Sequence, residues 1–429
     1  MPLSRRDFLL RSAGFVSVSA MVPRWAVAGT KMFEESVGAD AANRTLVVLE
    51  LMGGNDGLNT VVPYTDNAYS QVRSRIGIPV GSVLQISSKL GLNGMTVNGG
   101  TTPAMAGIKA LWDKNRVAIV EGIGYPNSSL SHFSSRDIWH TADPTLAQRR
   151  GWLGRWADAA IGNNVNPLAC VAISQSLPRT LLADNVSVPS FVDIATYAYK
   201  TDGAYPGDGK NQLNTFLAQS ADQYEIENTV STITGLGNDA ISSSNLLQTV
   251  ASGYVAGGQY PSGSLGAGML LIAQIINANV GARILYVTVG GFDNHADEDN
   301  NGPNGHNGLL LNVSESIEAF FDDLDAHGKS HDVVLMTWSE FGRRVQDNAS
   351  RGTDHGTSAP HFVVGDAVLP GIYGNPPSLT SLDSNGNLNI QNDFRSYYGT
   401  ILSDWLKADS TAILGAGWPN LGFLNKAYL

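Results

Sequence analysis

The 429-residue sequence contains a single cysteine, so it forms neither an intrachain disulfide nor a zinc site built of thiolates. Cys170 precedes the apolar run 171–173, which favours a buried, inert thiol over a reactive one. Charged residues make up only 15% of the chain, the net charge is −11, and no basic stripe is present. These features argue against a nucleic-acid partner, because neutralising phosphates requires clustered lysines and arginines.

Long apolar runs are also absent, so we expect no membrane span in the mature chain. The N-terminus carries Arg5-Arg6, then a weakly apolar stretch over 12–22, then the small residues 26–28. This order is typical of a twin-arginine signal that is cleaved after export. A membrane anchor is the alternative, but the stretch is too short for the ~30 Å of a bilayer core. The sequence therefore predicts a signal peptide over 1–28, the twin-arginine machinery as a partner, and a periplasmic or secreted protein.

Hydrophobic residues form 43% of the chain, which is enough for a large core in one domain over 29–429. Short apolar runs typical of buried parallel strands lie at 45–52, 116–122, 169–174, 283–290, 332–338 and 361–365. Helical segments are predicted between or after them, at 103–114, 265–279, 309–326 and 393–407. The alternation predicts an α/β fold, with a doubly wound, mostly parallel sheet flanked by helices.

Residues 200–262 differ from the rest, since they are rich in Gly, Ser, Asn, Gln and Ala. Helices are predicted near 211–234 and 238–254. The segment is either a helical cap inserted over the crevice of the sheet or an ordinary surface insertion, and composition does not decide between them.

Acidic and histidine side chains follow several of the predicted strands. Asp293 and His295 come after one apolar run, Asp354 and His355 lie a loop beyond another, and Asp56 lies in a glycine-rich turn after the first. The carboxyl ends of parallel strands meet at one crevice, where ligands bind. Three carboxylates and two imidazoles gathered there suit a divalent metal such as zinc.

The chain resembles the domain-of-unknown-function 1501 family over nearly its whole length. The segments that carry the resemblance are 46–64, 124–139, 151–156, 290–295, 339–343, 352–357 and 393–396. That family is similar to the alkaline phosphatase and sulfatase superfamily of metallohydrolases. The resemblance implies an alkaline-phosphatase-like fold, one or two divalent ions such as Zn or Ca, and hydrolysis of phosphate or sulfate esters.

The resemblance also implies a set of metal ligands. Asp354 and His355 match the superfamily's Asp-His pair. Asp293 and His295 match its second acidic-histidine element, although only Asn294 separates them here. In an extended segment, residues two apart point to the same side, so both side chains are able to reach one ion.

Other assignments stay open at this point. Asp56 matches the acidic turn that contacts metal in the superfamily, but an Asp in such a turn is also a common helix cap. Glu340 is either a ligand or an acceptor for a histidine that binds the metal. His361 is a third imidazole or a plain strand histidine. His306, His327 and His331 flank helices or loops, and we expect them to be solvated.

For the chemistry we expect Ser131, His132 and Arg343 to take part. Ser131 begins a predicted helix, whose N-terminus attracts anions, and it is the candidate nucleophile, with a water activated by the metal as the alternative. A plain N-cap role for Ser131 needs no chemistry. His132 is a base, a ligand or an anion contact. Arg343 either holds the substrate's oxygens or pairs with Glu340 or Asp347.

The sequence therefore predicts an exported metal-dependent hydrolase of phosphate or sulfate esters, acting on a small-molecule, glycan or lipid ester. The alternative is a non-catalytic exported binding or structural protein that retains the same fold. A complete set of metal ligands would favour the hydrolase, and an incomplete set would favour the non-catalytic protein.

Overall fold

The computed structural model describes residues 43–162, 166–194, 197 and 228–428. A nine-stranded sheet of order β11-β5-β10-β9-β1-β8-β6-β7, with β12 beside β5, lies at the centre of these residues. Its strands are β1 (Thr45–Leu51), β5 (Val117–Gly124), β6 (Cys170–Ile173), β7 (Ser190–Phe191), β8 (Ile284–Val289), β9 (Val333–Trp338), β10 (Ala359–Val364), β11 (Gly371–Tyr373) and β12 (Asn392–Asp393). Strand β10 pairs antiparallel with β5 and β9, whereas the other pairings are parallel.

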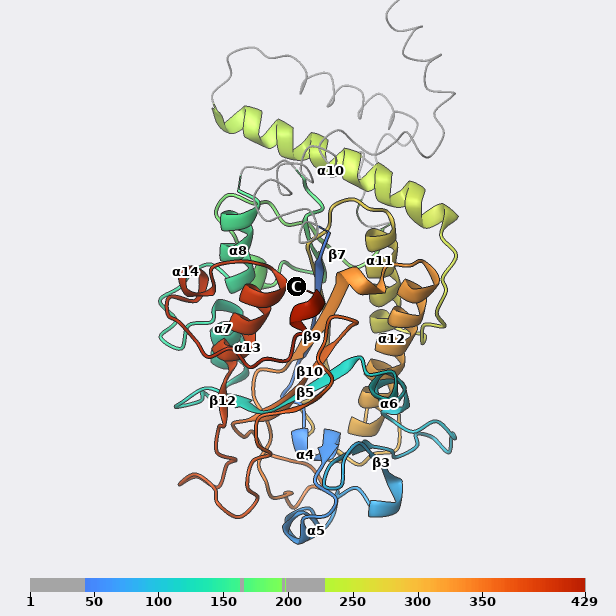
Figure 1. Cartoon of the computed structure of the whole chain (residues 1–429), viewed down its shortest axis with the longest axis vertical. Helices are drawn as coiled ribbons and strands as arrows, with labels where there is room; N and C mark the ends of the chain where they lie inside the picture. Colours follow the sequence, from blue (N-terminus) through green and yellow to red (C-terminus); the bar gives the residue numbers. More distant parts are fainter. Residues whose placement is uncertain (1–42, 163–165, 195–196, 198–227, 429) are drawn as a thin grey trace, which may run out of the picture.

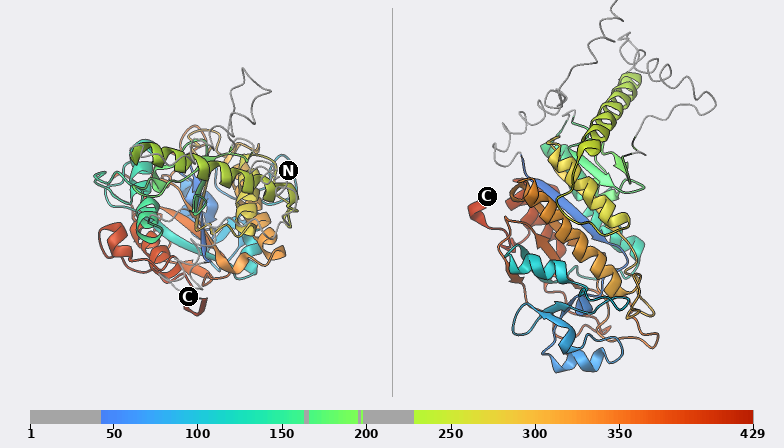
Figure 2. Two further views of the ribbon diagram at one scale, coloured as in Figure 1. Left: turned by 90° about the horizontal axis from the view of Figure 1, so that it is seen from above. Right: turned by 90° about the vertical axis from the view of Figure 1, so that its right-hand side faces the viewer.

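Helices cover both faces of this sheet (Figures 1 and 2). One face carries α6 (Ala106–Asp113), α11 (Ser264–Asn277) and α12 (His306–Ala326). The other carries α7 (His132–Thr141), α8 (Trp152–Ala160), α13 (Phe394–Thr400) with its π-helical continuation Ile401–Trp405, and α14 (Ser410–Leu414). The predicted doubly wound, mostly parallel sheet flanked by helices is therefore confirmed.

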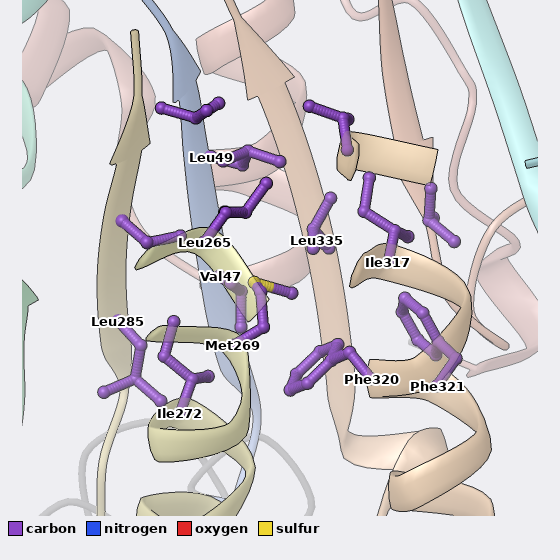
Figure 3. Close-up of a cluster of buried hydrophobic side chains, with 14 of the residues drawn as sticks. Val47, Leu49, Leu265, Met269, Ile272, Leu285, Ile317, Phe320, Phe321 and Leu335 are labelled. Atoms are coloured by element: carbon purple, nitrogen blue, oxygen red, sulfur yellow. The ribbon is translucent and has the colours of Figure 1, made fainter. Parts of the chain in front are cut away.

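The two faces are built by the alternation of side chains along each strand. In β1, Val47 and Leu49 point into the cluster beneath α11 and α12, while Leu46 and Val48 point into the cluster beneath α7, α8 and α13. Figure 3 shows the first cluster, where side chains of α11 and α12 pack against those of β1, β8 and β9. Because both faces are buried, these strands read as continuous apolar runs in the sequence.

The six predicted strands and the four helices predicted between or after them all exist, with ends shifted by a few residues. The shorter strands were not predicted, among them β7, β11 and the small antiparallel sheet of β2 (Val61–Val62), β4 (Gly91–Asn93) and β3 (Val83–Gln85). That small sheet lies beyond the carboxyl end of β1, with α4 (Gly57–Thr60) and α5 (Asn67–Val72). Cys170 is buried in β6, and burial raises the pKa of its thiol to about 12, as expected of an inert cysteine.

The predicted signal peptide over 1–28 lies outside the described residues, and so do residues 200–227 of the predicted cap. Residues 228–253 of that segment form one long helix, α10 (Asn228–Gly253), so the predicted break between helices at 234 and 238 is wrong. This helix lies at the opposite end of the molecule from α4 and α5 (Figures 1 and 2). In the described part of the chain, no helix combines the length and apolarity needed to cross a bilayer.

Candidate metal centre

Three loops and one helix start meet at the carboxyl ends of the central strands. The loops follow β1, β8 and β9, and the helix is α7. The loops approach very closely at Gly53, which has φ +120° and where a Cβ would lie 2.4 Å from the backbone nitrogen of Asp293. A side chain at Gly53 would therefore separate the β1 loop from the β8 loop, which explains the glycine.

Four side chains converge where these segments meet, and we call them the histidine cluster: His132, Asp293, His295 and His355. The Nε2 atoms of His295 and His355 lie 2.9 Å apart. Asp293 Oδ1 lies 3.1 Å from each of these nitrogens. Its other oxygen, Oδ2, lies 3.4 Å from Nε2 of His132. The carboxylate of Asp293 thus lies within 3.4 Å of a nitrogen of each of the three rings.

Hydrogen bonds on the far side of two rings determine which nitrogen faces the cluster as a lone pair. Nδ1 of His355 donates to the carbonyl of Leu130 at 2.7 Å. Nδ1 of His132 donates to Oε1 of Glu340 at 2.8 Å. A neutral imidazole that donates from Nδ1 has its lone pair on Nε2. This is the arrangement by which proteins orient metal-binding histidines.

The cluster fits a cation. Nε2 of His132 is buried and has no hydrogen-bond partner among the described residues. Two imidazole nitrogens 2.9 Å apart need a proton or a cation between them, since two facing lone pairs repel. Tetrahedral zinc with bonds of ~2.0–2.1 Å places its ligand atoms roughly 3.3 Å apart. Four separations in the cluster, between His295 and His355 and from Asp293 to each ring, run from 2.9 to 3.4 Å and are close to that spacing.

Asp293 is held in its ionised form. Burial works against the charge, but the hydrogen bond and the charge of Arg343, together with the neighbouring His355, outweigh burial and lower the pKa of Asp293 to about 2. Its carboxylate therefore carries a full negative charge at neutral pH, as a metal ligand must.

Arg343 has a different role from the one expected. Its side chain is fully buried and donates to the backbone carbonyls of Gly53, Gly54, Phe292 and Thr353 as well as to Asp293. All three nitrogens of the guanidinium therefore donate to the protein itself. Arg343 ties the three loops together and aims Asp293, and the prediction that it holds substrate oxygens is corrected.

Asp56, expected as a metal ligand, instead forms a buried ion pair with Arg73 of the segment after α5. Its Oδ1 also accepts from the backbone of Leu58 and caps α4. Glu298 lies against the pair, and burial together with the charge of Asp56 raises the pKa of Glu298 well above its usual value. Asp56 is therefore part of a buried network that supports the β1 loop, and the cap interpretation was the correct one.

The remaining predicted residues surround the histidine cluster. Glu340 is buried and accepts from His132 and from the backbone of Gly53, so it orients a histidine. Asp354 is more than half exposed, with its Oδ1 3.5 Å from Nδ1 of His295. Ser131 is exposed at the start of α7, and no side-chain cap bond of its own is formed.

Two further histidines, His361 and His306, are buried outside the histidine cluster. His361 is a buried strand histidine of β10, away from the cluster, and burial lowers its pKa to about 3. His306 was expected to be solvated, which is wrong: it is buried at the start of α12, where its Nε2 lies 3.0 Å from Oδ1 of Asn55.

The sequence predicted that His295 and His355 would meet, but it did not predict that His132 would join them. His132 was assigned to catalysis without a choice of role, yet its ring completes the group of His132, Asp293 and His355 that lies within the reach of one ion. The one feature of the sequence that pointed to His132 was its position at the start of a predicted helix. Nothing in the sequence shows that Glu340 orients the His132 ring.

Residues 238–395 match the family described as "Protein of unknown function (DUF1501)". The resemblance to that family is confirmed over this segment, which is a little over a third of the chain. The matched segment contains Asp293, His295 and His355, whereas His132 lies before it. No curated protein matches the chain.

Several solved structures resemble this one. The C-terminal periplasmic domain of EptC from Escherichia coli is 11% identical, with 87% of this chain and 86% of that chain covered and a TM-score of 0.37. The PsFucS1 sulfatase from Pseudoalteromonas sp. is 12% identical, with 95% and 74% covered and a TM-score of 0.34. The lipoteichoic acid synthase LtaP from Listeria monocytogenes is 9% identical, with 90% and 81% covered and a TM-score of 0.36.

Proposed function

We propose that this protein is a metal-dependent hydrolase of phosphate or sulfate esters. The observation that supports the proposal is the histidine cluster, in which an ionised carboxylate and the lone pairs of oriented imidazoles face one point. A bound cation would partner Nε2 of His132, which is buried without a hydrogen-bond partner among the described residues, and a buried lone pair without a partner costs free energy.

The donor set favours zinc over calcium. Imidazole nitrogens suit zinc, whereas calcium prefers six to eight oxygen ligands. His132, Asp293, His295 and His355 would hold one ion. Such an ion supplies Lewis-acid stabilisation of an ester's anionic oxygens and lowers the pKa of a nucleophile beside it.

The protein's own groups supply orientation. Glu340 and the Leu130 carbonyl hold the rings of His132 and His355, and Arg343 holds Asp293. Ser131 lies between Leu130, whose carbonyl accepts from His355, and His132, which belongs to the cluster. Its hydroxyl is the candidate nucleophile, and a water molecule is the alternative.

Turnover of model esters tests the proposal. The zinc-loaded mature protein is assayed with aryl phosphate monoesters, aryl phosphate diesters and aryl sulfates. We expect measurable hydrolysis of at least one class and a loss of 100-fold or more in kcat/KM for His355→Ala, on the order of the effect of removing one catalytic group. Ser134→Ala, on the same helix, is the matched control and should change little.

The Ser131→Ala variant separates the two nucleophiles. Loss of turnover comparable to that of His355→Ala supports attack by the Ser131 hydroxyl, and near-normal turnover supports attack by water. If no ester is turned over while zinc is bound and the fold is intact, the non-catalytic binding or structural protein becomes the better account.

We also propose that the protein acts after export as a folded chain. Arg5-Arg6 and the small residues 26–28 support this assignment. Replacing both arginines by lysine should leave the protein in the cytoplasm, as measured by cell fractionation. Export of that variant at the normal level would show that the N-terminus has another role.

A further inference from the structure

A cavity of about 420 Å³ opens at the carboxyl ends of β1, β6 and β8. Its wall combines apolar side chains with polar ones, including Arg136, Gln175, Ser176 and Thr288. In open α/β sheets, ligands bind outside the carboxyl ends of the strands, which is where this cavity lies. None of its lining residues belongs to the histidine cluster.

Arg136 is the only charged side chain among those that line this cavity. Its Nε donates to Oε1 of Glu50 at 2.7 Å, and Glu50 is fully buried in β1 and also accepts from Tyr286. This contact anchors the guanidinium at Nε. No described residue accepts a hydrogen bond from its two terminal amino groups, and the side chain is 32% exposed. Arg136 is thus anchored on one edge and open on the other.

The cavity adjoins the histidine cluster. Arg136 lies one helical turn after His132 on α7, so both project from the same side of the helix, about 6 Å apart along its axis. Met52 lines the cavity and precedes Gly53, whose backbone donates to Glu340, the acceptor of His132. Although burial lowers the pKa of Arg136, its bond to Glu50 and the nearby charges of Glu50 and Glu340 raise it overall.

We infer that Arg136 and this cavity form a subsite for a second anionic group on the substrate. The inference rests on the proposed function and specifies its substrate class: an ester whose alcohol portion carries a carboxylate, phosphate or sulfate of its own. An arginine held through Nε presents its two amino groups as a fork that matches such an anion. Ser176, Gln175 and Thr288 add hydroxyl and amide groups suited to the polar atoms around it.

Binding of paired phosphates tests the subsite without requiring turnover. The zinc-loaded protein is titrated calorimetrically with alkanediol monophosphates and with the matching α,ω-bisphosphates of increasing chain length. We expect one length of bisphosphate to bind about tenfold or more tightly than its monophosphate, since a charge-assisted bidentate contact is added. Arg136→Gln should abolish that preference, and Arg136→Lys should retain only part of it.

Arg75→Gln is the matched control, because Arg75 is a half-exposed arginine that lines a different cavity. It should leave the preference unchanged. Equal binding of bisphosphates and monophosphates by the wild type, or a preference that survives Arg136→Gln, would overturn the subsite. Neither of these outcomes would contradict the proposed ester hydrolysis. If the protein hydrolyses no ester, the preference for bisphosphates can still be measured, so the subsite and the hydrolase activity are tested independently.

Discussion

Single residues in this structure show how strongly burial decides the state of a side chain. Asp293 and Glu121 both carry a carboxyl group, but the pKa values of the two shift in opposite directions. The pKa of Asp293 is lowered to about 2, whereas the pKa of Glu121 is raised to about 8. Asp293 accepts from Arg343 and two histidines lie beside it, whereas Glu121 is buried in β5 with desolvation as the cause of its shift. Burial favours the neutral form unless donors compensate.

Glu121→Gln should stabilise the protein at alkaline pH. In the folded state Glu121 keeps its proton up to about pH 8, while in the unfolded chain it loses the proton above its ordinary pKa of 4.5. A raised folded pKa contributes stability that is full below 4.5 and is lost as the pH rises through 8. Glutamine does not ionise, so above pH 8 the variant should gain roughly 3–5 kcal/mol in the free energy of unfolding, at about 1.4 kcal/mol per pKa unit.

Denaturant unfolding of both proteins at pH 5 and pH 8.5 measures this difference. The gain should be small at pH 5 and large at pH 8.5. Asp113→Asn, at an exposed carboxylate, should change stability by no more than about 0.5 kcal/mol at either pH. A difference between Glu121→Gln and the wild type that does not vary with pH would contradict the assignment.

At the scale of elements, the sequence predicts the strands that are buried on both faces and misses the shortest ones. Strands β1, β8 and β9 are recognisable because every position is apolar or nearly so. Strands β7 and β12 have two residues each, too few for any periodicity. The antiparallel direction of β10 was also not predicted, because an apolar run has the same pattern in both directions.

The candidate site, too, was predicted only in part from the sequence. The motifs place Asp293, His295 and His355 on loops that meet, because those loops follow neighbouring strands of a parallel sheet. The partners of Asp56 and Arg343 were not predictable, since they depend on contacts such as that with Arg73, which comes from outside the motifs. A short polar motif specifies a position at the crevice, but tertiary packing decides whether the side chain faces a ligand or a neighbour.

At the scale of the whole molecule, the histidine cluster exists only in the folded chain. Its members lie at 132, 293–295 and 355, on segments brought together by the sheet and by α7. A cation that binds these groups binds the folded state and not the unfolded one, so it should raise the melting temperature. Cation binding is also the premise of the proposed hydrolysis.

The proposed metal centre is tested most directly by measuring zinc binding to the purified, chelator-treated mature protein. Calorimetric titration and the zinc-dependent shift in Tm both report this binding. We predict that the wild type binds about one zinc ion per chain. His132→Ala and His355→Ala should each bind zinc at least about 100-fold more weakly than the wild type. Glu340→Gln, which removes the negative charge that orients the His132 ring, should bind zinc about 10–100-fold more weakly. His331→Ala, at an exposed histidine outside the cluster, should bind like the wild type. Wild-type protein that folds normally but binds no zinc, or that binds it no more tightly than His355→Ala does, would contradict the metal centre.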